Sequence, residues 1–275
     1  MSKFINSQFV QSMQEITEES YRRYWDERNG GNLSLRIEEK ELEKFDDIRK
    51  DFDENERIDL GFDAKELSGE YYLVTGTGRF FRNIKTRSNL DLGLVRISDD
   101  GKAYNIVWGF EDGGRPTSEF PSHLMCHIQR RKKDENQKVI FHCHPTNLIA
   151  LSFTQELEEK KLSKLLWKMQ AESIVIFPEG IGIIPYMTPG TRKIGELTSQ
   201  KMQEYKAVLW AQHGLFASGN SLDEAYGLVE VIEKAAMIYT SIRSQNLSIK
   251  QEISDKDLRE IADYFKVKVH PEFLD

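Results

Sequence analysis

Residues 139–145 read VIFHCHP, an apolar run that ends in two histidines, His142 and His144. Side chains of a strand alternate between its two faces, so both imidazoles would lie on the same face. Cys143 would then point to the other face, and we expect it to be a core residue. The pattern therefore predicts a buried strand that presents two imidazoles at its end. Two such rings are either half of a metal site or a chance spacing.

A third histidine occupies a similar place, because His213 follows the apolar run 207–210. Catalytic zinc sites commonly have three protein ligands and one open position, and imidazole also suits iron, nickel and copper. His123 and His127 have i, i+4 spacing on a predicted helix, and His270 stands alone. No apolar strand presents these three, so we expect them to be structural. On pattern alone, the strand-end histidines remain either metal ligands or ordinary hydrogen-bonded residues.

The composition favours a cytoplasmic globular protein over a nucleic-acid-binding or membrane protein. The 275 residues are 39% hydrophobic, enough for a large core in one domain. A formal net charge of −7 argues against nucleic acid and anionic membranes as partners. Cys126 and Cys143 are the two cysteines, which is no disulfide framework and suggests a reducing compartment. There is no secretory signal pattern and no run of roughly 18 to 20 apolar residues, so we expect no membrane partner.

Helical and strand patterns alternate along the whole chain. They predict one α/β domain over 1–275, with a helical and charged N-terminal segment at about 1–70. Residues 6–28 fit one amphipathic helix that includes Tyr24, and the charged stretch 38–70 fits a solvated helix and loop. The other predicted helices are 119–131, 146–168, 190–205 and 221–244, and the predicted strands are 33–37, 71–74, 92–98, 103–109, 138–143, 174–177 and 207–210.

Glu119 and three small-residue turns are further candidates for a site. Glu119 begins a predicted helix, where a carboxylate either caps the helix or serves as a metal ligand or general acid and base. The turns are 29–32 (NGGN), 75–78 (TGTG) and 117–118 (TS). Their N–H groups and hydroxyls can hold a phosphate. Any one of them alone is more often an ordinary turn, and it is the occurrence of three that favours phosphate binding. None has the spacing of a P-loop or a dinucleotide-binding turn, so nucleotide binding is not predicted.

Six strings, in order between about residue 6 and about residue 265, resemble the class II aldolase/adducin superfamily. The first two are similar to those of its members that cleave L-rhamnulose 1-phosphate. The strings are WDERNGGNLS (25–34), VTGTGRFFRN (74–83), PTSE (116–119), HCHPTNLIAL (142–151), FPEGIGIIPYMTPGT (177–191) and HG (213–214).

This resemblance implies an α/β fold with a central, mostly antiparallel sheet flanked by helices on both faces. It implies a cytoplasmic homotetramer with one zinc ion per subunit, which would stabilise the enediolate formed in retro-aldol cleavage. The products from L-rhamnulose 1-phosphate would be dihydroxyacetone phosphate and L-lactaldehyde, in L-rhamnose catabolism. The resemblance matches His142, His144 and His213 to zinc ligands, Glu119 to the catalytic acid/base, Glu172 to a second glutamate at the aldehyde side, and Asn29, Gly31, Asn32, Thr77, Gly78, Thr117 and Ser118 to the phosphate-binding turns.

Other activities remain as alternatives. A fuculose- or ribulose-phosphate aldolase or 4-epimerase would use the same kind of site, but the long segment before residue 70 favours rhamnulose. A non-catalytic, adducin-like module would need neither three histidines nor Glu119, and a zinc hydrolase would be expected to contain HExxH. Pro145 departs from the alanine expected in the family and removes an N–H at a strand end. The C-terminal segment 251–275 either closes over the site or packs on a neighbouring subunit.

Overall fold

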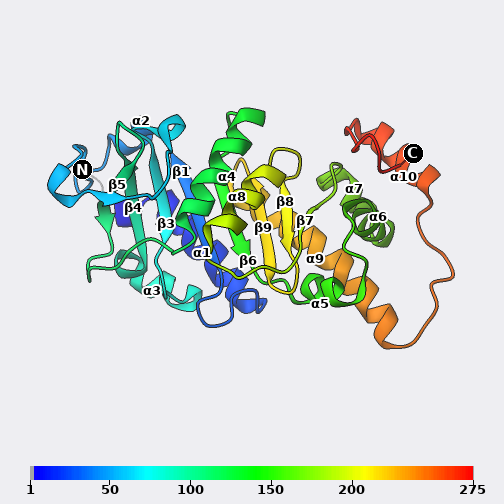
Figure 1. Cartoon of the computed structure of the whole chain (residues 1–275). Helices are drawn as coiled ribbons and strands as arrows, with labels where there is room; N and C mark the ends of the chain where they lie inside the picture. Colours follow the sequence, from blue (N-terminus) through cyan, green and yellow to red (C-terminus); the bar gives the residue numbers. More distant parts are fainter. Residues whose placement is uncertain (1–2, 275) are drawn as a thin grey trace.

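The computed structural model describes residues 3–274, and its centre is a nine-stranded sheet (Figure 1). The strand order is β2-β5-β4-β3-β1-β6-β9-β8-β7. Neighbouring strands are antiparallel except β7 and β8, so the predicted mostly antiparallel sheet is confirmed. The strands are β1 (Asn32–Ile37), β2 (Ile58–Asp59), β3 (Tyr71–Thr75), β4 (Leu92–Ile97), β5 (Ala103–Gly109), β6 (Val139–Cys143), β7 (Gly182–Ile184), β8 (Ala207–Trp210) and β9 (Gly214–Gly219).

Helices cover both faces of this sheet, as expected (Figure 1). α4 and α8 pack together over one face, while α1, α3 and α9 lie over the other. Strand β3 shows the reason, because alternate side chains point to opposite faces. Tyr71 and Leu73 join the core on the α1 side, whereas Tyr72 and Val74 join the core on the α4 side. The α-helices are α1 (Gln8–Arg22), α2 (Glu39–Leu42), α3 (Phe81–Asp91), α4 (Phe120–Lys133), α5 (Thr146–Thr154), α6 (Glu159–Met169), α7 (Ala171–Ile176), α8 (Arg192–Lys201), α9 (Leu222–Ser244) and α10 (Asp255–Phe265).

Short 3-10 helices complete the fold at Phe4–Asn6, Glu54–Glu56 and Lys65–Leu67. Across residues 3–274, none of the helices combines the length and the apolar character that crossing a membrane requires.

Helix α1 is shorter than predicted. It ends at Arg22, and Tyr24, expected on the apolar face, is 81% exposed with a φ of 61°. This left-handed residue stops the helix before the glycines that the sequence suggested as its end. Trp25 turns inward instead, and its ring lies 5.4 Å from that of Tyr226 on α9. The loop that follows, residues 23–31, is therefore anchored to the core by Trp25.

The strand predicted at 174–177 is wrong, because Ala171–Ile176 form helix α7. Ser173 and Ile174 are buried there, and α7 packs on α6, α9 and α10. A short apolar run fits a buried helix as well as a strand, and tertiary packing decided between them. Strands β7 and β9 and helices α3 and α10 were not predicted.

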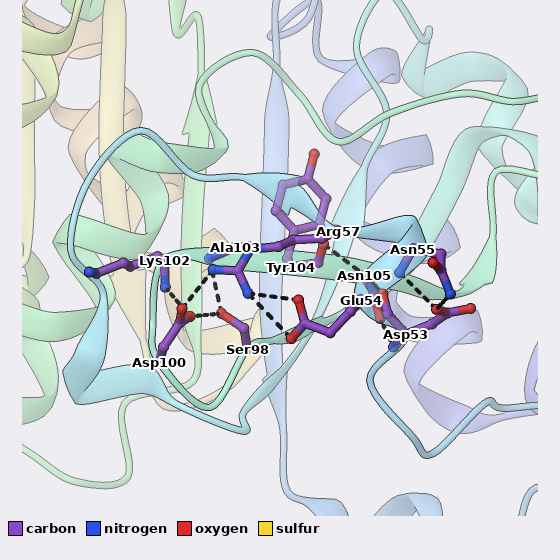
Figure 2. Close-up of polar contacts among 10 residues, drawn as sticks. All are labelled: Asp53, Glu54, Asn55, Arg57, Ser98, Asp100, Lys102, Ala103, Tyr104 and Asn105. Carbon is purple, nitrogen blue, oxygen red and sulfur yellow. Dashed lines mark hydrogen bonds and ion pairs between the residues drawn. The ribbon is translucent and has the colours of Figure 1, made fainter.

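The charged stretch 38–70 is only partly solvated. Phe45, Ile48 and Leu60 in it are buried in the core. Figure 2 shows how the stretch is fastened to the hairpin of β4 and β5: the Arg57 guanidinium donates to Asp100 at 2.6 Å, and Asp53 N–H donates to Asn105 Oδ1 at 2.5 Å. The expectation of a solvated helix and loop therefore holds for the charged side chains and fails for the apolar ones between them.

The C-terminal segment packs on its own chain, on α6 and α7. Phe273 is buried, with its ring 5.9 Å from that of Trp167 on α6, and His270 N–H donates to Pro178 O. Figure 1 places this segment beyond the β7 edge of the sheet. Neither closure over the histidines nor dependence on a neighbouring subunit is needed to order it.

Candidate active site

Three histidine rings converge where β6 ends and β8 turns into β9. His142 lies near the end of β6, His144 directly follows that strand, and His213 lies in the turn between Trp210 and Gly214. Their ring centroids are 5.0 to 5.1 Å apart, and one ring nitrogen from each lies within 4.8 Å of the others. Gly214 permits this approach, because a Cβ there would lie 2.6 Å from Cys143 O and 2.7 Å from His144 Cδ2. Cys143 itself is buried in the core, as predicted.

The hydrogen bonds of the three rings leave nitrogens available for a metal ion. His142 Nδ1 is 3.1 Å from Leu215 O and His144 Nδ1 is 2.7 Å from Glu27 Oε1. Within residues 3–274, His142 Nε2, His144 Nε2 and His213 Nδ1 are buried without a hydrogen-bond partner. Buried polar atoms are rarely left unpaired, and imidazole is a good ligand for transition metals, so the donor set fits a metal ion.

Burial also sets the protonation state that a metal requires. Desolvation lowers the pKa of His142 well below its usual value, and the neighbouring His144 and His213 lower it further. Desolvation, followed by the neighbouring His144, lowers the pKa of His213 to about 4. Both rings are therefore neutral near pH 7, as ligands must be.

The loop after α1 contacts His144 through three of its residues. His144 N–H donates to Trp25 O at 2.7 Å, and the ring nitrogen contacts Glu27. Gly30 lies under the ring, since a Cβ there would come within 2.5 Å of His144 Cε1. A carboxylate on the second nitrogen of a metal-binding histidine fixes its tautomer and orientation. Residues 25–30, part of the WDERNGGN string, thus hold His144 in place.

A second carboxylate secures the chain just after the triad. Glu233 on α9 accepts from the N–H groups of Asn147 and Leu148, each at 2.9 Å, at the start of α5. Pro145 directly precedes this helix with a φ of −67°, a value that proline adopts without strain. Its lack of an N–H is therefore compatible with the turn between β6 and α5. Sequence analysis did not identify Glu233, because nothing near it in the sequence marks it as a helix cap.

Glu119 points toward the triad. It occupies the N-cap position of α4, but its side chain makes no capping hydrogen bond. Glu119 Oε2 instead accepts from Asn32 Nδ2 at 2.8 Å and lies 3.9 Å from His142 Nε2. Burial raises the pKa of Glu119, and the bond from Asn32 opposes that rise. A carboxylate with these neighbours can exchange a proton with a molecule held at the histidines.

The predicted phosphate turns lie beside one another next to Glu119. Thr117 N–H donates to Thr75 O and Thr77 N–H donates to Arg115 O, both at 2.9 Å, so these amides are occupied. Within residues 3–274, the N–H groups of Asn29, Gly31, Gly78 and Ser118 have no hydrogen-bond partner. The members divide by exposure: Asn29, Thr77, Gly78 and Ser118 are exposed, while Gly31, Asn32 and Thr117 are buried. Hydroxyls and these four unbonded amides are therefore what the turns offer an anion.

Glu172 is not brought to the triad by this chain. It lies exposed in the first turn of α7, whose packing partners are α6, α9 and α10. Figure 1 places α6, α7 and α10 beyond the β7 edge, whereas the triad lies at β6 and the β8–β9 turn. The buried pair His123 and His127, expected to be structural, lies under the sheet, and both rings contact Ser34.

Comparisons with known proteins point to one family. The family described as "Class II Aldolase and Adducin N-terminal domain" matches residues 11–240. A protein named rhamnulose-1-phosphate aldolase from Listeria monocytogenes serotype 4b is 44% identical over 266 residues, covering 97% of this chain and 96% of that protein. One of the same name from Enterococcus faecalis is 43% identical over 263 residues, covering 96% and 93%. A solved sugar-phosphate aldolase from Thermotoga maritima has a TM-score of 0.73 at 31% identity, covering 88% and 97%.

This chain belongs to the class II aldolase and adducin family. Within the family, it is similar over nearly its full length to proteins named rhamnulose-1-phosphate aldolase.

Proposed function

We propose that this protein is a zinc-dependent aldolase that cleaves L-rhamnulose 1-phosphate into dihydroxyacetone phosphate and L-lactaldehyde in L-rhamnose catabolism. The names of relatives at 43 to 44% identity support the substrate. The observation that carries the chemistry is the convergence of three histidines with Glu119, whose Oε2 lies 3.9 Å from His142 Nε2. We further propose one zinc ion per subunit, held by His142, His144 and His213, in a cytoplasmic homotetramer.

The residues fit the steps of a retro-aldol reaction. The C3–C4 bond breaks as the C4 hydroxyl gives its proton to the ionised carboxylate of Glu119, and the bonding electrons pass to the C2 carbonyl to give the enediolate of dihydroxyacetone phosphate. A bound zinc ion supplies a Lewis acid for the developing negative charge. Glu119 delivers the proton that C3 needs. The turns with Asn29, Gly31, Asn32, Thr77, Gly78, Thr117 and Ser118 hold the phosphate and thereby orient the reacting bond.

Glu172 remains our proposal for the aldehyde side of the site. Because α7 lies beyond the β7 edge of its own chain, this proposal requires Glu172 to come from a neighbouring subunit of the proposed homotetramer.

The test is cleavage of L-rhamnulose 1-phosphate, followed as release of dihydroxyacetone phosphate, before and after EDTA treatment and after zinc is restored. Activity that disappears with the chelator and returns with zinc supports reaction, metal and substrate together. L-fuculose 1-phosphate and L-ribulose 5-phosphate serve as matched substrates. Faster turnover of either one by the zinc-loaded protein would overturn the proposed substrate and keep the proposed metal chemistry.

A further inference from the structure

Five buried side chains form one hydrogen-bonded chain that ends at Glu119. Ser34 Oγ on β1 lies 2.9 Å from His127 Nε2 and 2.8 Å from His123 Nδ1, both on α4. His123 Nε2 contacts Asn32 Oδ1 at 2.5 Å, and Asn32 Nδ2 contacts Glu119 Oε2 at 2.8 Å. Each of the five residues is at most 8% exposed. The proposed catalytic carboxylate is therefore the end of a connected polar chain.

The chemistry of these groups fixes the direction of donation. An amide oxygen can only accept, so His123 Nε2 must carry a hydrogen and donate it to Asn32 Oδ1. Burial lowers the pKa of His123 to about 3, so the ring is neutral and its Nδ1 accepts. The Ser34 hydroxyl therefore donates to His123 Nδ1, and its oxygen accepts from His127 Nε2.

The far end of the chain supports the same direction. Among the residues that the structure describes, His127 Nδ1 is buried without a hydrogen-bond partner. In the direction above, that nitrogen carries only a lone pair. With every bond reversed, it would carry a buried N–H without an acceptor, and orphaned donors of this kind are rarer than orphaned acceptors. The unpartnered nitrogen of His127 thus selects one direction for the whole chain.

We propose that His123 is a positioning residue that holds the amide of Asn32 with its NH₂ group toward Glu119. Asn32 then offers a donor to the carboxylate, which keeps Glu119 oriented toward the triad. Without the His123 donor, the amide of Asn32 is free to rotate and present its oxygen to Glu119. This inference rests on the proposed function, in which Glu119 transfers the proton at C3.

The test compares His123→Gln with His123→Met, two side chains of nearly equal size. The glutamine amide can replace the Nε2 donor to Asn32, whereas the methionine cannot. We expect His123→Met to lower kcat for L-rhamnulose 1-phosphate about 10²-fold, as a displaced catalytic group does. Its KM and zinc content should stay near those of the wild type. The exchange of dihydroxyacetone phosphate hydrogen with D₂O, followed by NMR, should fall with kcat, and His123→Gln should recover most of both.

A role limited to packing would lower the stability of both variants without separating their kcat values. Equal kcat and equal exchange in folded, zinc-loaded His123→Gln and His123→Met would overturn the inference. If His123→Met does not fold, Ser34→Ala gives the answer, because it removes the donor to His123 Nδ1 while leaving a small side chain. A folded Ser34→Ala protein with wild-type kcat would also overturn it. Wild-type protein that neither cleaves nor exchanges would instead refute the proposed function.

Discussion

Two pairs of histidines in this molecule have the spacing of metal ligands, and their surroundings differ completely. His142 and His144 lie at the end of β6, while His123 and His127 lie one turn apart on α4. All four are largely buried, and burial lowers the pKa of both helix histidines as it does that of His142. Burial therefore does not separate the two pairs.

Convergence with a third histidine separates them. Each strand histidine has one ring nitrogen bonded and the other unpartnered within the described part of the chain, and one nitrogen of each lies within 4.8 Å of a nitrogen of His213. The helix histidines share one serine hydroxyl, and their bonds lead away from each other along a polar chain. The helix pair also contains an unpartnered nitrogen, His127 Nδ1, so a free nitrogen alone does not mark a metal site. The candidate metal site is distinguished by nitrogens of three histidines that converge.

The sharpest test of this contrast removes one ring from each pair. We expect His142→Ala to lose nearly all bound zinc and to lower turnover by more than about 10³-fold, since it deletes one of three proposed ligands. His127→Gln is the matched control, and its zinc content should equal that of the wild type. Zinc per chain, measured by atomic absorption on folded protein, checks both. Loss of zinc from His127→Gln would mean that the helix pair holds the metal.

Glu119 lies between the two pairs, and its replacement tests which one it serves. Glu119→Gln should keep its zinc, because the triad provides three ligands without it. Turnover should fall about 10²- to 10³-fold, the usual contribution of a general acid or base. Zinc content and kcat measured on the same preparation distinguish the roles. A Glu119→Gln protein that loses zinc along with activity would make the carboxylate a ligand.

Glu27 tests whether the strand pair depends on support from outside the triad. Its side chain is 70% exposed, yet it bonds His144 Nδ1 at 2.7 Å. Glu27→Gln should weaken zinc binding about 10- to 100-fold, the usual effect of removing such a partner. The zinc dissociation constant, from competition with a chromophoric chelator, measures this. Glu15→Gln removes an exposed carboxylate elsewhere and should leave the zinc dissociation constant unchanged. An equal weakening of zinc binding in Glu15→Gln would mean that net charge, and not the bond to His144, causes the effect.

The smallest effect concerns Asp26, the neighbour of Glu27 that has no histidine partner. Asp26 is 3% exposed, and neither carboxylate oxygen has a hydrogen-bond partner in residues 3–274. Burial raises the pKa of Asp26 to about 7, so its contribution to stability is complete below about pH 4 and is lost as the pH rises through 7. Asp26→Asn should therefore be more stable than the wild type near pH 8, by on the order of 2 kcal/mol.

Urea unfolding at about pH 5 and about pH 8 measures that difference, which should widen with pH. Asp46→Asn, at an exposed aspartate, is the control and should show no such widening. A constant difference across the range would show that Asp26 does not titrate as its burial implies.

The sequence predicts the parts of this fold whose information is local. The apolar run that ends in His142 specifies β6, since a period of two and an apolar stretch are properties of adjacent residues. The hairpin of β4 and β5 is equally local, because its turn residues lie between its strands. Strands β1, β3, β4, β5, β6 and β8 and the strand ends that carry histidines were therefore accessible without a structure, whereas β7 and β9 were not.

What could not be predicted depends on residues far apart in the sequence. Ile174 lies in a helix because α6, α9 and α10 surround it, and nothing adjacent to it distinguishes that from a strand. Tyr24 ends α1 because Trp25 is drawn into the core against Tyr226. The chain from His123 through Asn32 joins residues 91 positions apart, so the spacing of the helix histidines gave no sign of it.

These long separations along the sequence also determine when the site can form during folding. Glu27 and His144 are 117 residues apart, and His142 faces Phe216 across the β6–β9 pair. Such non-local pairing is acquired late and slowly, so the three histidines cannot meet until β9 has been synthesised and added to the sheet. A metal ion therefore has no assembled site to bind in the early stages and cannot nucleate this chain. It would slow the unfolding of the finished protein, while the rate of refolding should not depend on its concentration.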